Sequence, residues 1–395
     1  MHRPRRVAWR RVATIAVVAV CVSCAPVAMT ELWPYAQRGA PAFGEWVLAR
    51  AVSPRYVAEA VADRLGPYGR SLVALVVHSV LGGVLMLLGP VQLLSAVRRR
   101  VRLHRAVGVV FALSVYASMA GAAVYLVRTA PRDAFSGPAF WIVLTTILVG
   151  TVLSVTFGIF AAVGRFPDLH QRWLLLCYGF LMTAPLLRLE WGALPWLLPG
   201  LSMADINRVA VMHLGSVVAF GALLASRALD RRATVSGVRG TWVPTPALAV
   251  VHLAGAAALA WIVRSYLGRG SEGLRLLVAY LVPYAVTYAV LLVRQRRAGR
   301  DGRSWAREEW RLHLAALCLA PVLSVGAALL FGRYMGLDRG TALSAGVAIG
   351  CGMLAFAATA AVSLRIMSAR ELVEREGPAA PPRPAPGPVT RVANP

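Results

Sequence analysis

The chain consists largely of apolar stretches that are long enough to cross a membrane. A membrane-spanning helix needs about 20 apolar residues, and these stretches are rich in Leu, Val, Ala and Gly without the period-two alternation of a β-barrel. They cover residues 9–29, 71–97, 104–128, 138–163, 171–190, 206–229, 242–265, 274–294, 312–333 and 341–366. We therefore predict an all-α polytopic integral membrane helix bundle with about ten transmembrane helices.

Basic residues are distributed unequally between the two sides of the predicted membrane. All 42 are Arg, and with an inner N-terminus 28 of them fall in inner segments and 14 in outer ones. This positive-inside pattern predicts that both termini are cytoplasmic and that the chain lies in the cell inner (plasma) membrane. The net charge of +25 then forms a cytoplasmic rim, which favours anionic lipid head groups as partners and argues against nucleic acid.

Polar segments divide the chain into six parts. We expect an N-terminal anchor helix at 1–29, an outer loop with an interfacial helix at 30–70, a five-helix core at 71–229, a linker at 230–241, a four-helix bundle at 242–366 and a Pro-rich, disordered cytoplasmic tail at 367–395. The interfacial helix has a predicted apolar face of Tyr56, Val57, Val61 and Leu65 opposite Glu59, Asp63 and Arg64. Such a helix is typical of a membrane surface.

Four histidines in the five-helix core fall at two membrane depths. His78 and His213 are near the outer ends of their predicted helices, whereas His104 and His170 are at inner ends. Ionisable residues within a membrane are costly and usually mark a site. Two histidines that face each other can supply both axial ligands of a haem iron. We therefore predict haem b as the cofactor, with His104 and His170 as one ligand pair and His78 and His213 as another.

Other polar residues near these histidines have predicted supporting roles. Gln92 shares a helix face with His78, so we expect it beside the cofactor. Arg102 and Arg105 flank His104 and can bind haem propionates through guanidinium forks. Asp168 precedes His170 and can orient its imidazole. The alternative is that these are interfacial and structural residues among lipid head groups.

A second group of polar residues lies near the predicted outer surface. Arg188 and Glu190 are two positions apart, so on one helix they do not face each other. We expect each to pair elsewhere, with Asp205 or Arg208 as candidates. The group is either a buried structural network or a small pocket for a quinone, a reductant or a substrate.

Residues 71–190 resemble a bacterial membrane family known as domain of unknown function 2306. The residues that carry the resemblance are His78 and Gly82, Gly89-Pro90-Val91-Gln92, His104-Arg105 with Gly108, His170 with Arg172-Trp173, and Leu187-Arg188-Leu189. It implies a membrane helix bundle but brings no activity. More distantly, the histidines resemble those of two-haem transmembrane b-type cytochromes, which implies a quinone or another redox partner. In those cytochromes four consecutive helices carry ligands, whereas the helix at 138–163 has no histidine.

Three classes of function are therefore compatible with the sequence. The leading interpretation is a b-type haem module for transmembrane electron transfer. The second is a cofactor-free transporter of small solutes or lipids, or a membrane assembly partner. The third is a lipid-modifying enzyme, for which Asp168 and His170 are the candidate acid–base pair. The GRGSEG segment at 268–273 fits a dinucleotide-binding pattern, but it lies between membrane helices without a preceding strand.

Overall fold

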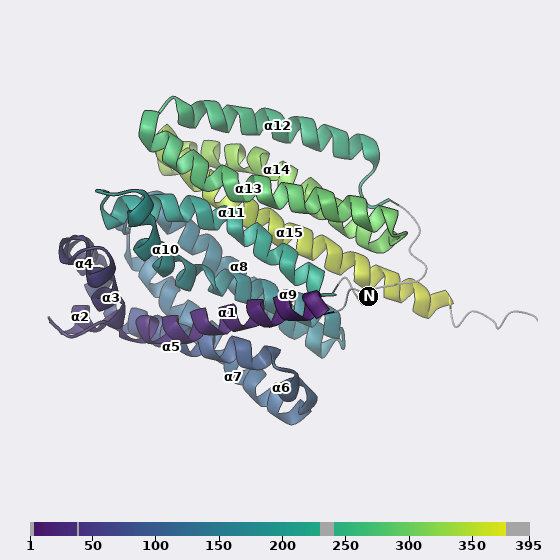
Figure 1. The fold of residues 1–395 in the computed structure, drawn as a ribbon, viewed down its shortest axis with the longest axis horizontal. Helices are drawn as coiled ribbons and strands as arrows, with labels where there is room; N and C mark the ends of the chain where they lie inside the picture. Colours follow the sequence, from purple (N-terminus) through teal and green to yellow (C-terminus); the bar gives the residue numbers. More distant parts are fainter. Residues whose placement is uncertain (1–3, 38, 230–240, 377–395) are drawn as a thin grey trace, which may run out of the picture.

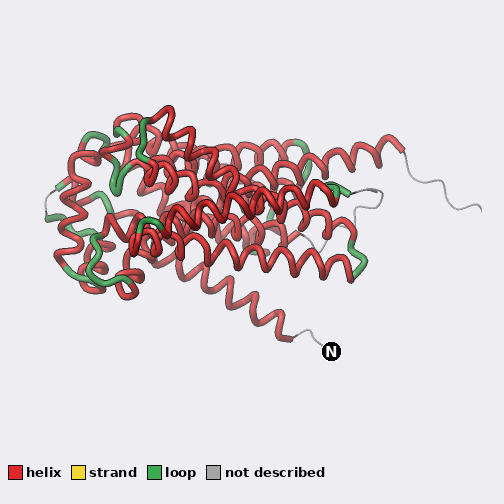
Figure 2. The backbone as a smooth tube through the Cα atoms, turned by 90° about the horizontal axis from the view of Figure 1, so that it is seen from above, coloured by secondary structure: helices red, strands yellow, loops and turns green. Residues whose placement is uncertain are grey.

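All the regular elements in the described part of the chain are helices (Figures 1 and 2). The computed structural model describes residues 4–37, 39–229 and 241–376. The shorter helices are α2 (Trp33–Ala36), α3 (Phe43–Ala51), α4 (Pro54–Gly69), α6 (Ser95–Arg99), η1 (Pro131–Asp133), α9 (Pro167–Leu181) and α10 (Thr183–Leu197). The longer helices are α1 (Pro4–Thr30), α5 (Leu72–Leu93), α7 (Val101–Arg128), α8 (Pro138–Val163), α11 (Met203–Leu229), α12 (Thr245–Leu267), α13 (Gly270–Arg300), α14 (Ser304–Met335) and α15 (Arg339–Glu376).

Proline and glycine mark several helix ends. Pro138 and Pro167 stand at the first positions of α8 and α9, where a missing N–H costs nothing. Gly336 ends α14 in the left-handed conformation, with φ of 64°, which glycine adopts without strain. These prolines and this glycine allow short turns between long helices.

The apolar blocks confirm a multi-pass membrane protein. Among the described residues, nine helical segments are long and apolar enough to cross a membrane, and α9 and α10 together make one of them. Of the ten predicted blocks, the one at 206–229 corresponds to α11, which is not among these nine. The exact number of crossings and the sides of the termini remain predictions. The predicted linker, apart from Thr241, and the tail from residue 377 onward lie outside the described residues.

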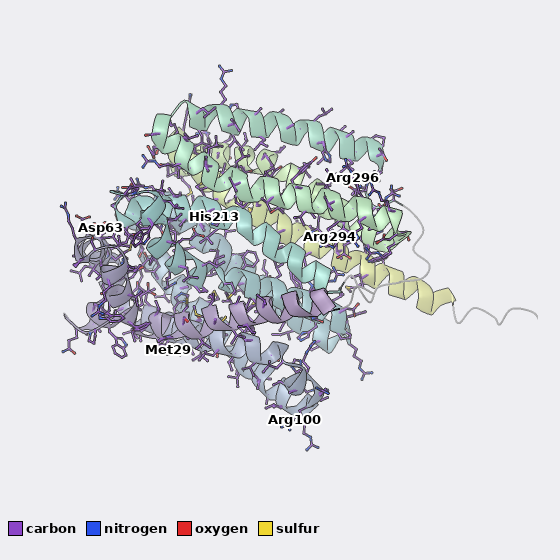
Figure 3. The ribbon with its side chains drawn as sticks, viewed as in Figure 1. Met29, Asp63, Arg100, His213, Arg294 and Arg296 are labelled. Atoms are coloured by element: carbon purple, nitrogen blue, oxygen red, sulfur yellow. The ribbon has the colours of Figure 1, made fainter. Side chains whose placement is uncertain are left out.

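The long helices lie side by side and define two ends of the bundle (Figure 1). The α4 end carries the short helices α2 to α4, and the α6 end carries the start of α7 and the turn between α13 and α14. Asp63 and Arg100 mark the two ends in Figure 3. One hydrophobic cluster runs without interruption from α4 and α10 through α11 into α12, α13, α14 and α15. The packing therefore continues across the predicted linker.

Helix α4 packs across one end of the bundle. The face that it buries differs from the predicted apolar face. The buried residues are Tyr56, Val57, Ala60 and Arg64, whereas Leu65 is exposed. The assignment of Arg64 to the polar face was therefore wrong. Its guanidinium lies 5.0 Å from the ring of Phe135 and 5.6 Å from that of Trp191, so aromatic faces replace water around the charge.

Candidate functional site

A cavity of about 210 Å³ lies inside the bundle between α1, α5, α7, α8, α9, α10, α11 and α15. A single water needs only about 10–15 Å³ by the same measure, so the cavity has room for a larger molecule. Its walls are mostly apolar; the lining includes Leu85, Met86, Met119, Phe140, Val143, Ile147, Phe180, Leu187 and Trp191. Pockets of this kind bind apolar bodies and use a few polar groups to orient them.

The polar groups of the cavity gather around a carboxylate near the end of α1. Glu31 forms an ion pair with Arg188, and both side chains line the cavity. A second guanidinium, that of the buried Arg64, lies 3.9 Å from the carboxylate of Glu31. Tyr68 also lines this region, and burial raises the pKa of its phenol, which stays protonated. Glu31 and Arg188 are the charged groups at this end of the cavity wall, and Arg64 lies behind Glu31 without lining the cavity.

His78 lines the same cavity from α5. Its Nδ1 lies 3.0 Å from the backbone carbonyl oxygen of Ser118, which can only accept a hydrogen bond. The Ser118 hydroxyl also lies 3.0 Å from Nδ1. In the tautomer that donates to the carbonyl, Nε2 is the atom left to accept a proton or bind a ligand. The Ser118 hydroxyl donates back to the carbonyl oxygen of His78 at 3.0 Å. These contacts hold the imidazole in one orientation on the cavity wall.

A break in a membrane-crossing segment lies on the cavity wall. Helix α9 ends at Leu181 and α10 begins at Thr183. The apolar block at 171–190 predicts one helix here. Pro185 has no N–H to donate to the carbonyl of Leu181, which accounts for the interruption. The residues from Phe180 to Ala184 all line the cavity. Met182, between the two helices, keeps right-handed helical dihedral angles (φ −69°, ψ −11°), so the interruption is local. A proline in a membrane helix is tolerated where neighbouring groups satisfy the freed backbone carbonyl.

The predicted outer histidine pair is not formed. His213, labelled on α11 in Figure 3, has its Nδ1 2.6 Å from a carboxylate oxygen of Glu190, and it does not line the cavity. His78 instead contacts Ser118, as described above. The two rings share a predicted depth, but each is fixed by a partner on a neighbouring helix. Shared depth does not determine the direction in which a side chain points.

The predicted partners of Arg188 and Glu190 were also wrong. Arg188 pairs with Glu31 and Glu190 with His213, whereas Asp205 and Arg208 pair with each other at 2.8 Å. The expectation that Arg188 and Glu190 do not face each other is confirmed. Their true partners lie in the turn after α1 and on α11, and only the folded bundle brings them together.

The predicted inner pair is brought together near the α6 end. The ring centroids of His104 and His170 lie 6.5 Å apart with the rings nearly perpendicular. The Nδ1 of His170 lies 2.8 Å from the carbonyl oxygen of Gly158, which leaves its Nε2 available. The side-chain amide of Gln92 donates to the backbone carbonyl of His104 at 3.3 Å. The structure therefore places Gln92 beside this pair rather than beside His78.

The two imidazoles lie close enough to share one metal ion. Because a metal–imidazole bond is about 2.0–2.1 Å, two rings that share one metal have centroids about 6 Å apart. The described residues contain no group of three or more His, Cys, Asp or Glu that could hold a metal ion. A haem supplies the remaining ligands itself, so two histidines suffice. Neither His104 nor His170 lines the large cavity.

The other predicted residues at the α6 end have simpler surroundings. Arg102 and Arg105 are exposed beside His104. His170 uses the Gly158 carbonyl as its Nδ1 partner, in the place where we expected Asp168. The acid–base role of Asp168 in a lipid-modifying enzyme remains a prediction.

Part of the chain matches a known family of membrane proteins. Residues 75–226 match the family model described as "Predicted membrane protein (DUF2306)". No curated protein and no solved structure matches the chain. The DUF2306 region extends from α5 into α11, and it contains all four histidines as well as Arg172 and Arg188.

Two cations of the DUF2306 region, the buried Arg172 and the half-buried Arg188, pair with carboxylates outside it. Arg188 pairs with Glu31, which directly follows α1, and Arg172 forms a two-pronged pair with Glu309 of α14. Sequence reasoning missed Glu31, Arg64 and Glu309. The spacing of Tyr56, Ala60 and Arg64, four residues apart on α4, was the available signal for Arg64.

Proposed function

We propose that the protein binds an amphipathic molecule from the bilayer in the cavity between α1, α5 and α10, and acts as a carrier for lipids or lipophilic solutes. The observation that supports this function is an apolar cavity with the Glu31–Arg188 pair at one end and the broken α9–α10 segment in its wall. Transport needs such a site within the membrane together with a helix that can bend.

The charges around the cavity favour a ligand with acceptor oxygens. Arg188 lines the cavity beside Glu31, whereas Arg64 shares the Glu31 carboxylate from outside the cavity wall. The Nε of Arg188 is buried and has no hydrogen-bond partner in the described part of the chain. A carboxylate, a phosphate or the carbonyls of a quinone would accept from this N–H group of Arg188. The ligand class is therefore an apolar molecule with an anionic or carbonyl head.

Photolabelling of the parent chain and of a variant whose cavity is filled by a side chain would test this proposal. The probes are a diazirine-bearing long-chain fatty acid and a diazirine-bearing quinone, applied to the full chain in nanodiscs. A Cβ at Gly82 would meet no atom within 4 Å, and Gly82 lines the cavity, so Gly82→Phe fills it from α5. We expect label on peptides of α5 or α9–α10 in the parent chain and at least a fivefold loss in Gly82→Phe.

The control is Gly326→Phe, since Gly326 also has free space around it but is not part of the cavity. Equal labelling of the Gly82→Phe variant, or label confined to helices that do not line the cavity, would rule out this site.

The contact between His104 and His170 favours a second candidate, a b-type haem electron-transfer module. In this proposal His104 and His170 would hold the haem iron, Arg102 and Arg105 would bind its propionates, and Gln92 would support the backbone of His104 through their hydrogen bond. A bound haem would supply one-electron chemistry. A quinone in the cavity would then be the redox partner. The positive-inside pattern supports a cytoplasmic α6 end in the inner (plasma) membrane.

A reduced-minus-oxidised spectrum of protein purified from haem-sufficient cells tests the second candidate. We expect a b-type α band that is lost in His104→Ala and in His170→Ala. His252→Ala is the matched control, because the Nδ1 of His252 bonds to the carbonyl of Leu248 in its own helix. A well-folded protein without a band would refute the haem proposal and leave the carrier proposal untouched.

A further inference from the structure

A groove of about 390 Å³ lies at the α6 end, where α13 turns into α14. It is lined by Gln295, Arg296, Gly299, Arg300 and Arg307. The three arginines are all exposed, and Figure 3 shows Arg296 at this end of α13. Three cations thus converge on one concave surface at the end of a membrane-crossing helix.

The arginines of this groove differ from their neighbours in the same turn. Arg297 and Arg303 both lie within ion-pair distance of Asp301, at 4.0 and 3.4 Å. Arg296, Arg300 and Arg307 have no carboxylate within ion-pair distance among the residues that the structure describes. Like charges that converge without a counter-charge repel one another, and an anion would relieve that repulsion.

We infer that this groove binds the phosphate group of an anionic phospholipid. A guanidinium presents a planar fork of donors that matches phosphate oxygens, and three forks can surround one phosphate. Gln295 adds an amide that can bond to the glycerol or head-group oxygens. The inference is independent of the cavity and of the histidine pair.

An apolar stripe on α13 indicates a phospholipid rather than free phosphate. Val282, Val286 and Val293 are 57%, 52% and 62% exposed. Their spacing continues along the same helix face to Arg296 and Arg300, which are three and seven residues beyond Val293. An acyl chain can lie along the valines while its phosphate reaches the groove. A soluble anion would use the arginines but not the stripe.

Native mass spectrometry of the full chain would test the site. The probes are phosphatidylglycerol and phosphatidylcholine of equal chain length, added in equal amounts to protein in mild detergent. Each basic residue near an anionic head group contributes about fivefold in affinity. We expect the parent chain to retain phosphatidylglycerol preferentially, and Arg296→Gln/Arg300→Gln/Arg307→Gln to lose that preference by at least tenfold.

Two further variants make the result decisive. Arg297→Gln is the matched control, because Arg297 lies in the same turn but faces Asp301; it should keep the preference. Gly299→Asp places a carboxylate in the groove, where a Cβ at this position lies at ordinary contact distance from Arg307, and it should reproduce the loss if the triple variant fails to fold.

Three results would overturn the inference. They are equal retention of both lipids by the parent chain, an unchanged preference in a folded triple variant, and full displacement of the lipid by millimolar inorganic phosphate. The last result would identify a site for free phosphate.

Discussion

Glu31 is the residue on which the polar end of the cavity depends. It is 13% exposed, lies in the first membrane-crossing segment and has guanidiniums of Arg64 and Arg188 on two sides. A charge in this position persists only when opposite charges are held close to it. The three side chains come from the turn after α1, from α4 and from α10, so this carboxylate joins segments that are distant in sequence.

Removing the carboxylate should therefore cost more than removing either cation. We expect Glu31→Gln to lower the free energy of unfolding by about 3 kcal/mol, because it takes the counter-charge from the buried Arg64 and the half-buried Arg188. Arg188→Gln should cost about 1–2 kcal/mol, since Arg64 remains as a partner for Glu31. Thermal unfolding in detergent measures both. An equal or reversed order would show that Arg64 does not share the carboxylate.

The site could be predicted from single residues only in part. We predicted from their shared depth that His104 and His170 lie close together, and their rings are in contact. Both residues lie near helix starts at the same end of the bundle. The same reasoning failed for His78 and His213, because the rotation of each helix about its axis decides where a ring points. The partner of Arg188 could not be predicted, since Glu31 is 157 residues away along the chain.

Glycines determine how closely the helices approach one another. A Cβ at Gly121 of α7 would overlap the carbonyl oxygen of Ala74 on α5, and the contact between these helices is one of the most extensive in the bundle. Membrane helices associate mainly through close packing, for which small residues are required. The α5–α7 pair positions His78 against Ser118, so this crossing also shapes the cavity.

Substitution of alanine should separate packing glycines from the others. Gly121→Ala forces α5 and α7 apart, and we expect a loss of about 1–3 kcal/mol in the free energy of unfolding. Gly326→Ala, which meets no atom within 4 Å, should be neutral or stabilising by up to about 1 kcal/mol because alanine favours helix. The two effects of opposite sign are measured in the same unfolding assay. A neutral Gly121→Ala would contradict the close crossing.

The start of α15 has a cap whose strength depends on pH. Asp338 accepts from the backbone N–H groups of Gly340 and Thr341 at 2.9 and 3.0 Å. Hydrogen bonding by Thr341 holds the pKa of this carboxyl below its usual value. The group is therefore charged in the folded state at pH values where it begins to protonate in the unfolded state. Its contribution is complete above the unfolded pKa and is lost as the pH falls through the folded one.

We expect Asp338→Ala to lower stability by about 0.5–2 kcal/mol at neutral pH, as for other lost caps. Asp338→Asn keeps an acceptor oxygen and should retain most of the cap while losing its dependence on pH. Unfolding measured from pH 7 to pH 3 separates the two variants. If the parent chain and Asp338→Asn respond to acid in the same way, the carboxylate has no special role in this cap.

At the scale of elements, apolar length predicted the helices well and their interruptions poorly. A membrane-crossing helix requires only a sufficient length of apolar residues such as Leu, Val and Ala, and this can be read directly from the sequence. The break between α9 and α10 depends on one missing N–H at Pro185, and proline often sits within a membrane helix without ending it. Pro283 and Pro321, for example, lie inside the continuous helices α13 and α14.

The whole molecule is held together by contacts between the DUF2306 region and the helices on either side of it. A single hydrophobic cluster spans α10, α11 and α12 to α15, and Arg172 of α9 pairs with Glu309 of α14 inside the protein. Both side chains are less than 5% exposed. The sequence suggested two bundles joined by a linker, because a buried pair between distant helices leaves no local pattern.

Breaking the Arg172–Glu309 pair should destabilise the whole molecule. We expect Arg172→Met and Glu309→Gln each to cost about 3–5 kcal/mol, because each leaves one buried charge without its partner. Arg172→Met combined with Glu309→Leu should recover most of that loss, since an apolar pair of similar volume carries no desolvation penalty. Arg208→Gln is the control: its pair with Asp205 is about half exposed, so the change should stay within about 0.5 kcal/mol. If the single variants unfold like this control, the two groups of helices are held by apolar packing alone, and the ion pair contributes neither stability nor register to their interface.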